Sequence, residues 1–79
     1  MAGNVILILG GTIEAIEIAC DLEQIENTTV ITSLAGVTRS PRLPKGKVRY
    51  GGFGGKDGLF DYFIREKITL VIDATHPFA

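Results

Sequence analysis

The sequence predicts an α/β fold built on a parallel sheet, and three observations lead to this fold class. An unbroken apolar run, Val5–Leu9, is typical of a strand that is buried on both faces. That run ends at Gly10-Gly11-Thr12, and a helical pattern begins at once. Further strand-like segments then follow, with a second helical pattern between the last two of them. Strands joined through helices in this way are typical of parallel sheets.

Length, composition and charge narrow the class of protein. The 79 residues allow one small domain, and an apolar fraction of 46% excludes a disordered chain. A net charge of −1 gives no reason to expect nucleic acid or an anionic membrane as a partner. No apolar run approaches the length of about 18 residues that a membrane span needs. A single cysteine, Cys20, fits a reducing compartment, so we expect a cytoplasmic protein.

The first helix is expected from about Thr12 to Glu26. Its apolar side repeats at helical spacing and comprises Ala15, Ile18, Ala19, Leu22 and Ile25. The helix is followed by a β-branched strand, Thr28–Ser33. Because Ala15 and Ala19 are small and one turn apart, the helix can lie close to the strands.

Strands and helices alternate less regularly in the second part of the chain. Residues 34–46 contain turn formers and two prolines but no helical period, so we expect an irregular connection. A short strand at Lys47–Tyr50, a helix at Asp57–Lys67 and a strand at Leu70–Ile72 follow. The expected arrangement is a four-stranded, Rossmann-like half domain with strand order 3-2-1-4 and two helices. We therefore expect residues 1–79 to be one nucleotide-binding half, in a chain that is a fragment or a severely shortened protein.

The turn after the first strand is the first candidate site. Glycines at the carboxyl end of a buried strand allow a phosphate to approach the backbone, and the N-terminus of the next helix attracts it. Gly10, Gly11 and Thr12 are therefore expected to hold the pyrophosphate of a dinucleotide. The glycines are adjacent rather than spaced as in the dinucleotide fingerprint. The alternative is that they form only a tight strand-to-helix connection.

The end of the second strand bears on the choice of cofactor. In nicotinamide-binding folds this position meets the adenine ribose, where an acidic residue favours NAD and a nearby arginine favours NADP. Here Thr32 and Ser33 offer hydroxyls without a carboxylate, and Arg39 and Arg42 follow. We expect Ser33 and Arg39 at the adenosine end and NADP(H) as the preferred cofactor. The alternative is that both arginines are simply solvated.

A glycine-rich loop follows the third strand. Residues 51–55 read Gly-Gly-Phe-Gly-Gly, and each glycine loses much backbone entropy when it is ordered. Such a loop is useful where the backbone approaches a ligand, so we expect Gly52 and Gly54 to line the cofactor cleft. Phe53 stacks on a flat ring or plugs the loop onto the core. A plain flexible turn is the alternative for the whole loop.

Polar residues also follow the fourth strand. Asp73, Thr75 and His76 emerge at its carboxyl end, the side on which open α/β sheets bind ligands. We expect Asp73 and Thr75 to contribute to the cofactor site. His76 is the only histidine and is the candidate proton donor, with a structural role as its alternative. We expect no metal site.

Five segments together resemble the precorrin-6A reductase family. They are Leu-Gly-Gly-Thr-Ile-Glu-Ala (9–15), Thr-Ser-Leu-Ala-Gly (32–36), Pro-Arg-Leu-Pro (41–44), Gly-Gly-Phe-Gly-Gly (51–55) and Asp-Ala-Thr-His-Pro-Phe-Ala (73–79). The resemblance implies reduction of precorrin-6A, or of cobalt-precorrin-6A, to the 6B form by a nicotinamide cofactor in cobalamin biosynthesis. It also implies a tetrapyrrole substrate.

The same resemblance identifies the chain as the N-terminal part of a longer two-domain α/β protein. We expect the isolated chain to bind cofactor weakly and not to reduce the substrate. The missing C-terminal half, or another copy of the chain, would complete the site.

One position departs from the family pattern. Where the family commonly carries an arginine after Ala35-Gly36, this chain has Val37. Either Arg39 substitutes for it, or the chain also accepts NAD(H). The resemblance also implies that the cobalt-containing variant of the pathway uses NADH.

Two rival functions remain open from the sequence. One is the cofactor-binding half of an epimerase- or dehydratase-like nicotinamide enzyme, whose Tyr-x-x-x-Lys pair would lie beyond residue 79. Tyr62 does not begin such a pair, because position 66 is a glutamate. The other rival is a non-catalytic nucleotide-binding module.

Overall fold

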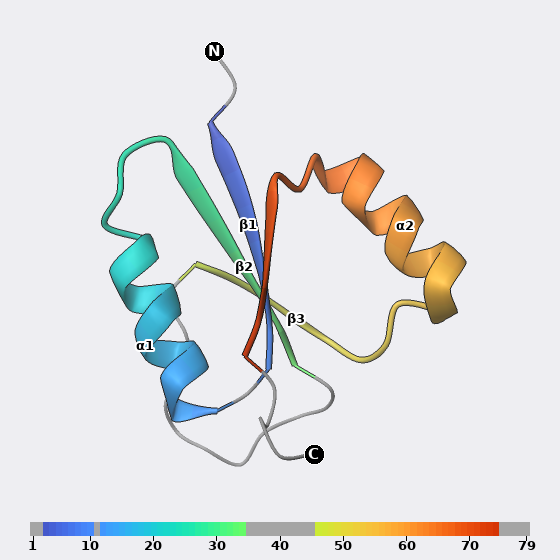
Figure 1. Cartoon of the computed structure of the whole chain (residues 1–79), viewed down its shortest axis with the longest axis horizontal. Coiled ribbons are helices and arrows are strands. Elements are labelled where there is room, and N and C mark those ends of the chain that lie inside the picture. The colour runs from blue at the N-terminus through green and yellow to red at the C-terminus, as the bar shows by residue number, and fades with distance from the viewer. Residues whose placement is uncertain (1–2, 11, 35–45, 75–79) are drawn as a thin grey trace.

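The computed structural model describes residues 3–10, 12–34 and 46–74 (Figure 1). The elements in chain order are β1 (Asn4–Leu9), α1 (Ile13–Leu22), β2 (Thr28–Leu34), β3 (Lys47–Tyr50), α2 (Gly55–Glu66) and β4 (Leu70–Asp73). This order matches the predicted succession of four strands and two helices. No helix in these ranges has the length and apolarity that crossing a membrane requires.

The four strands form one sheet in the order β3-β2-β1-β4, and every pairing is parallel. The predicted fold class and strand order are therefore confirmed. The two central strands carry the buried part of the sheet, and Leu7, Ile8 and Val30 are fully shielded from solvent. An apolar run such as that of β1 suits a central strand because both of its faces are covered.

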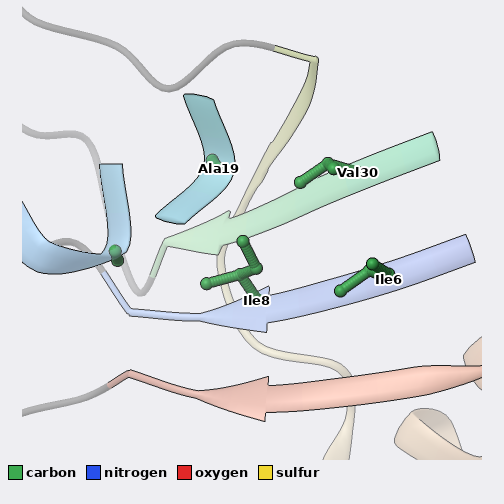
Figure 2. Close-up of a cluster of buried hydrophobic side chains, with 5 residues drawn as sticks. Ile6, Ile8, Ala19 and Val30 are labelled. Carbon is green, nitrogen blue, oxygen red and sulfur yellow. The ribbon is translucent and has the colours of Figure 1, made fainter. Parts of the chain in front are cut away.

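The core lies between the sheet and α1. Ile6 and Ile8 of β1 and Val30 of β2 point toward α1, where Ala19 faces them (Figure 2). Ala15 of α1 belongs to the same buried cluster. Both alanines are fully buried, as their spacing along the predicted helix suggested. Their short side chains let the helix approach the strands closely, so branched side chains of the sheet fill the space between the two layers.

Helix α1 ends at Leu22, four residues before the predicted end. After Leu22 the N–H groups of Gln24 and Ile25 bond to carbonyls only three residues earlier, which tightens the turn. Asn27 then takes a left-handed conformation with φ 58°. Asparagine tolerates this conformation, and the chain reverses there toward β2. The predicted periodicity continued through Ile25, but that side chain is 53% exposed and does not pack in the core.

Helix α2 lies on the opposite side of the sheet from α1 (Figure 1). It begins at Gly55, two residues before the predicted start, and ends one residue before the predicted end. Lys67 closes it with a left-handed C-cap, and the N–H of Ile68 bonds to the carbonyl of Phe63. None of the helix residues is buried, and the apolar side chains of Phe60 and Ile64 are both 62% exposed.

Candidate nucleotide-binding site

One row of paired residues crosses the carboxyl end of the sheet. Arg49 of β3 pairs with Ser33 of β2, Ser33 pairs with Leu9 of β1, and Leu9 pairs with Asp73 of β4. Side chains in one row of a sheet project from the same face. The structure thus brings the predicted residues Ser33 and Asp73 to the same edge, on either side of the strand that leads into the Gly10 turn.

The turn after β1 joins three elements at this edge. Gly10 has φ 137°, a conformation that side-chain-bearing residues rarely adopt, and its N–H donates to the carbonyl of Ser33 at 3.1 Å. The hydroxyl of Thr12 caps α1 by accepting from the N–H of Ala15 at 3.1 Å. The same hydroxyl donates to the carbonyl of Ala74 at 3.2 Å, which ties the start of α1 to the end of β4.

This arrangement suits a phosphate. The Thr12 cap uses the N–H of Ala15, and the preceding N–H groups of the first turn have no partner within the helix. These groups and the positive end of the helix dipole lie beside a glycine turn at the carboxyl edge of a parallel sheet. Donors of this kind fit the pyrophosphate of a dinucleotide.

Arg49 is a site residue that the sequence pattern does not mark, because residues 47–50 predict only a short strand. Its Nη1 atom donates to Oγ of Ser33 at 2.7 Å and to the carbonyl of Gly51 at 3.1 Å. Its Nη2 atom donates to the carbonyl of Gly52 at 2.9 Å. The signal that could have found it is its position, since the end of β3 lies next to the end of β2 in the predicted order.

Two aromatic rings hold the guanidinium of Arg49. Its central carbon lies 3.8 Å from the centroid of the Phe53 ring and 5.1 Å from that of Tyr62. The two rings contact each other edge to face, with their centroids 5.1 Å apart. Phe53 therefore anchors the glycine-rich loop against Arg49 and α2.

Glycines serve different purposes in and after this loop. Gly51 and Gly54 have φ values of 89° and 87°, which favour glycine, whereas a Cβ at Gly52 would meet open space. Gly58 lies one turn into α2, and a Cβ there would collide with the carbonyl of Phe53. The close approach at Gly58 lets the loop fold back over the start of α2 and places Phe53 under Arg49.

The environment of Tyr62 changes its acidity. Burial raises the pKa of its phenol above the ordinary value of about 10, and the negative charge of Glu66 acts in the same direction. The positive charges of Arg49 and Arg65 oppose this shift without cancelling it. Tyr62 therefore stays neutral beside Arg49 and supplies an uncharged aromatic surface for the guanidinium.

Several predicted site residues lie outside the described part of the chain: Gly11, Arg39, Thr75 and His76. The hypotheses that concern them stay predictions. The structure brings four predicted residues to the carboxyl end of the sheet: Gly10, Thr12, Ser33 and Asp73. Gly52 lies in the loop that follows β3, and Gly54 is the N-cap residue of α2. Within the ranges that the structure describes, no group of three or more histidine, cysteine or acidic side chains could hold a metal ion.

Known proteins resemble this chain over nearly all of its length. The precorrin-6A reductase of Rhodococcus erythropolis is 51% identical over 74 residues, which are 94% of this chain and 30% of the relative. The precorrin-6A reductase of a Sinorhizobium species is 53% identical over 74 residues, or 94% of this chain and 28% of the relative. The chain thus spans less than a third of the length of these curated relatives.

The fold is also similar to that of a solved structure. A CobK precorrin-6A reductase superposes with a TM-score of 0.82 at 45% sequence identity, over 95% of this chain and 30% of that one. The family described as precorrin-6x reductase CbiJ/CobK matches residues 5–79. The chain therefore belongs to the precorrin-6x reductase CbiJ/CobK family.

Proposed function

We propose that this chain is the cofactor-binding portion of a reductase that converts precorrin-6A, or its cobalt-containing form, to the 6B form in cobalamin biosynthesis. The observation that carries the proposal is the convergence of Gly10, Thr12, Ser33 and Asp73 at the carboxyl edge of a parallel sheet. Open α/β sheets bind dinucleotides at that edge. Family membership supports the reductase over an epimerase or a dehydratase, since the relatives are named precorrin-6A reductases.

The binding roles follow from the chemistry of each position. Gly10, Gly11 and Thr12 bind the pyrophosphate through backbone N–H groups and the start of α1. Ser33 and Arg39 contact the adenosine end. The end of the second strand lacks the carboxylate that would favour NAD. We therefore propose NADP(H) as the preferred cofactor, with NAD(H) as the alternative. Gly52 and Gly54 line the cleft because they offer backbone without side chains.

The reacting end of the cofactor is assigned to the end of β4. When bound, the nicotinamide supplies the hydride, and the protein supplies orientation and electrostatics. Asp73 and Thr75 position that end, and His76 delivers the proton to the second carbon of the reduced bond. The tetrapyrrole would lie across the same edge, with its far side covered by protein that follows the region matched here or by a second copy.

A chimera tests this proposal directly. The chain is fused to the part of the R. erythropolis relative that follows its matched region, and NADPH consumption is measured with precorrin-6A. We expect the chimera to reduce the substrate, because the two matched regions are 51% identical. We expect the chain alone to bind NADPH weakly without turnover, since positioning of the substrate contributes several kcal/mol to such reactions.

Three other outcomes would count against parts of the proposal. If neither protein binds NADPH, the site is not a nicotinamide-cofactor site. Binding by the chimera without reduction would favour the non-catalytic module. Turnover by the chain alone, at the rate of the unmodified relative, would show that it forms a complete site. The unmodified R. erythropolis protein is the positive control.

A further inference from the structure

The adenosine end of the proposed site contains a cation, the guanidinium of Arg49, to which the sequence pattern gives no role. The guanidinium of Arg49 lies 2.7 Å from Oγ of Ser33, the side chain placed at the adenine ribose. A phosphate on the 2′-oxygen of a ribose bound at Ser33 would lie within reach of that guanidinium. We propose that Arg49 is the residue that selects the 2′-phosphate of NADP(H) over the bare hydroxyl of NAD(H). This inference rests on the proposed cofactor-binding function.

The Ser33 hydroxyl and the guanidinium form a matched pair of donors. Oγ of Ser33 accepts from Arg49, and within the described ranges its hydroxyl hydrogen has no acceptor, so that hydrogen can donate to a ligand. Arg49 has five N–H donors in a planar fork, and its bonds to Ser33, Gly51 and Gly52 use three of them. Such a fork matches the oxygens of a phosphate better than the point charge of a lysine does.

The charge of Arg49 is held in place before any ligand binds. The central carbon of the guanidinium lies over the Phe53 ring, 3.8 Å from its centroid. Two carbonyls of the glycine-rich loop fix the direction of the fork. Among the residues that the structure describes, no carboxylate forms an ion pair with it. A cation that is ordered and not neutralised loses little side-chain entropy on binding an anion, which strengthens the interaction.

The rival role for Arg49 is purely structural. Its bonds to Gly51 and Gly52 also tether the loop, and a tether would support NADP(H) and NAD(H) equally. The two roles therefore differ in selectivity rather than in overall affinity. Calorimetric titration of NADP⁺ and NAD⁺ at one salt concentration separates them, and 2′,5′-ADP against 5′-AMP repeats the comparison without the nicotinamide.

The titrations use the unsubstituted chain, the chimera, and the variants Arg49→Gln and Arg49→Lys of both. Arg49→Gln should lower the affinity for NADP⁺ and 2′,5′-ADP by about 10- to 100-fold, the loss expected for a charged hydrogen bond. The affinity for NAD⁺ and 5′-AMP should change little. The affinity of Arg49→Lys for NADP⁺ should lie between those of the unsubstituted protein and Arg49→Gln, because lysine keeps the charge but loses the fork. Arg65→Gln is the matched control, since Arg65 is exposed on α2 and lies 5.4 Å from the ring of Tyr62.

An equal loss for both cofactors would make Arg49 a tether and overturn the proposal. Unchanged selectivity in Arg49→Gln would also overturn it and leave Arg39 as the candidate cation. If the unsubstituted proteins bind no nicotinamide cofactor, the proposed function itself fails, and this inference fails with it.

A second measurement covers the case in which Arg49→Gln does not fold. In the unsubstituted chain, the Nε–H resonance of Arg49 is followed by NMR during titration with 2′,5′-ADP and with 5′-AMP. We expect a larger shift with 2′,5′-ADP and none at Arg65. Equal shifts with both nucleotides would contradict a contact to the 2′-phosphate.

Discussion

Arg49 and Ser33 are paired neighbours at the carboxyl ends of β3 and β2, joined by a 2.7 Å hydrogen bond between Nη1 and Oγ. The bond connects the proposed adenosine end to the glycine-rich loop, because the same guanidinium also holds the carbonyls of Gly51 and Gly52. A change in the conformation of the loop should therefore alter the position of Arg49 and its bond to Ser33.

Gly58→Ala should destabilise the protein although alanine is the better helix former. Its Cβ would collide with the carbonyl of Phe53, so the loop would have to move away from Arg49. We expect a loss of about 1–3 kcal/mol in the free energy of unfolding, the usual range for overpacking. Gly52→Ala is the matched control, because its Cβ would meet open space. Urea denaturation measures both variants, and equal stabilities would contradict the close approach at Gly58.

Thr32→Val should stabilise the protein. The Thr32 side chain is fully buried, and its hydroxyl oxygen has no hydrogen-bond partner among the residues that the structure describes. Its neighbours in the sheet are Ile8 and Val48, so a methyl group suits the site. Removing an unsatisfied buried hydroxyl should add about 1 kcal/mol or more to the free energy of unfolding. Ser33→Ala, next in the chain, should have the opposite effect because it breaks the bond to Arg49. A loss of stability in Thr32→Val would show that the hydroxyl has a partner in solution.

Thr12→Ala should weaken both the start of α1 and its link to β4. The substitution removes the N-cap to Ala15, a loss of about 1 kcal/mol, and the bond to the carbonyl of Ala74. Thr12→Ser keeps the hydroxyl and is the control for both bonds. Thr12→Asp separates them, because a carboxylate caps a helix but cannot donate to a carbonyl. Thermal unfolding should rank the variants Ser, Asp, Ala from most to least stable. An alanine variant as stable as the serine variant would refute the cap.

Tyr62 should ionise above its ordinary pKa of about 10. In a Tyr50→Phe background Tyr62 is the only tyrosine, so phenolate absorbance reports it alone. Arg49→Gln should raise the pKa of Tyr62 further, because it removes a positive charge that favours the phenolate. Glu66→Gln should lower it for the converse reason. An unchanged pKa in both variants would mean that neither charge acts on the ring.

The raised pKa of Tyr62 also affects stability at high pH. The folded state holds the proton more tightly than the unfolded state, so the unfolded state loses its proton first as the pH rises. The contribution of Tyr62 to stability is therefore complete below about pH 10 and is lost as the pH rises through its folded pKa. Tyr62→Phe, which cannot ionise, should remove this pH dependence in alkaline denaturation experiments.

The sequence by itself determined the elements and their order. The run Val5–Leu9 predicted a central strand, and the pair Ala15 and Ala19 predicted the buried side of α1. These signals are local, because the period of the side chains and the residues at a turn depend on near neighbours. The convergence of Ser33 and Asp73 at one edge also followed, since parallel strands end at the same side of a sheet.

Only the tertiary structure decided how the side chains meet. The bond from Arg49 to Ser33 depends on the register between β2 and β3, and no pattern in the connection between these strands specifies that register. The bond from Thr12 to Ala74 joins residues 62 positions apart. Helix α1 ended at Leu22, where bonds to carbonyls three residues earlier tightened the chain before the left-handed Asn27, although the apolar periodicity continued to Ile25. Contacts of this kind arise from packing between distant segments, and local sequence patterns carry no information about their geometry.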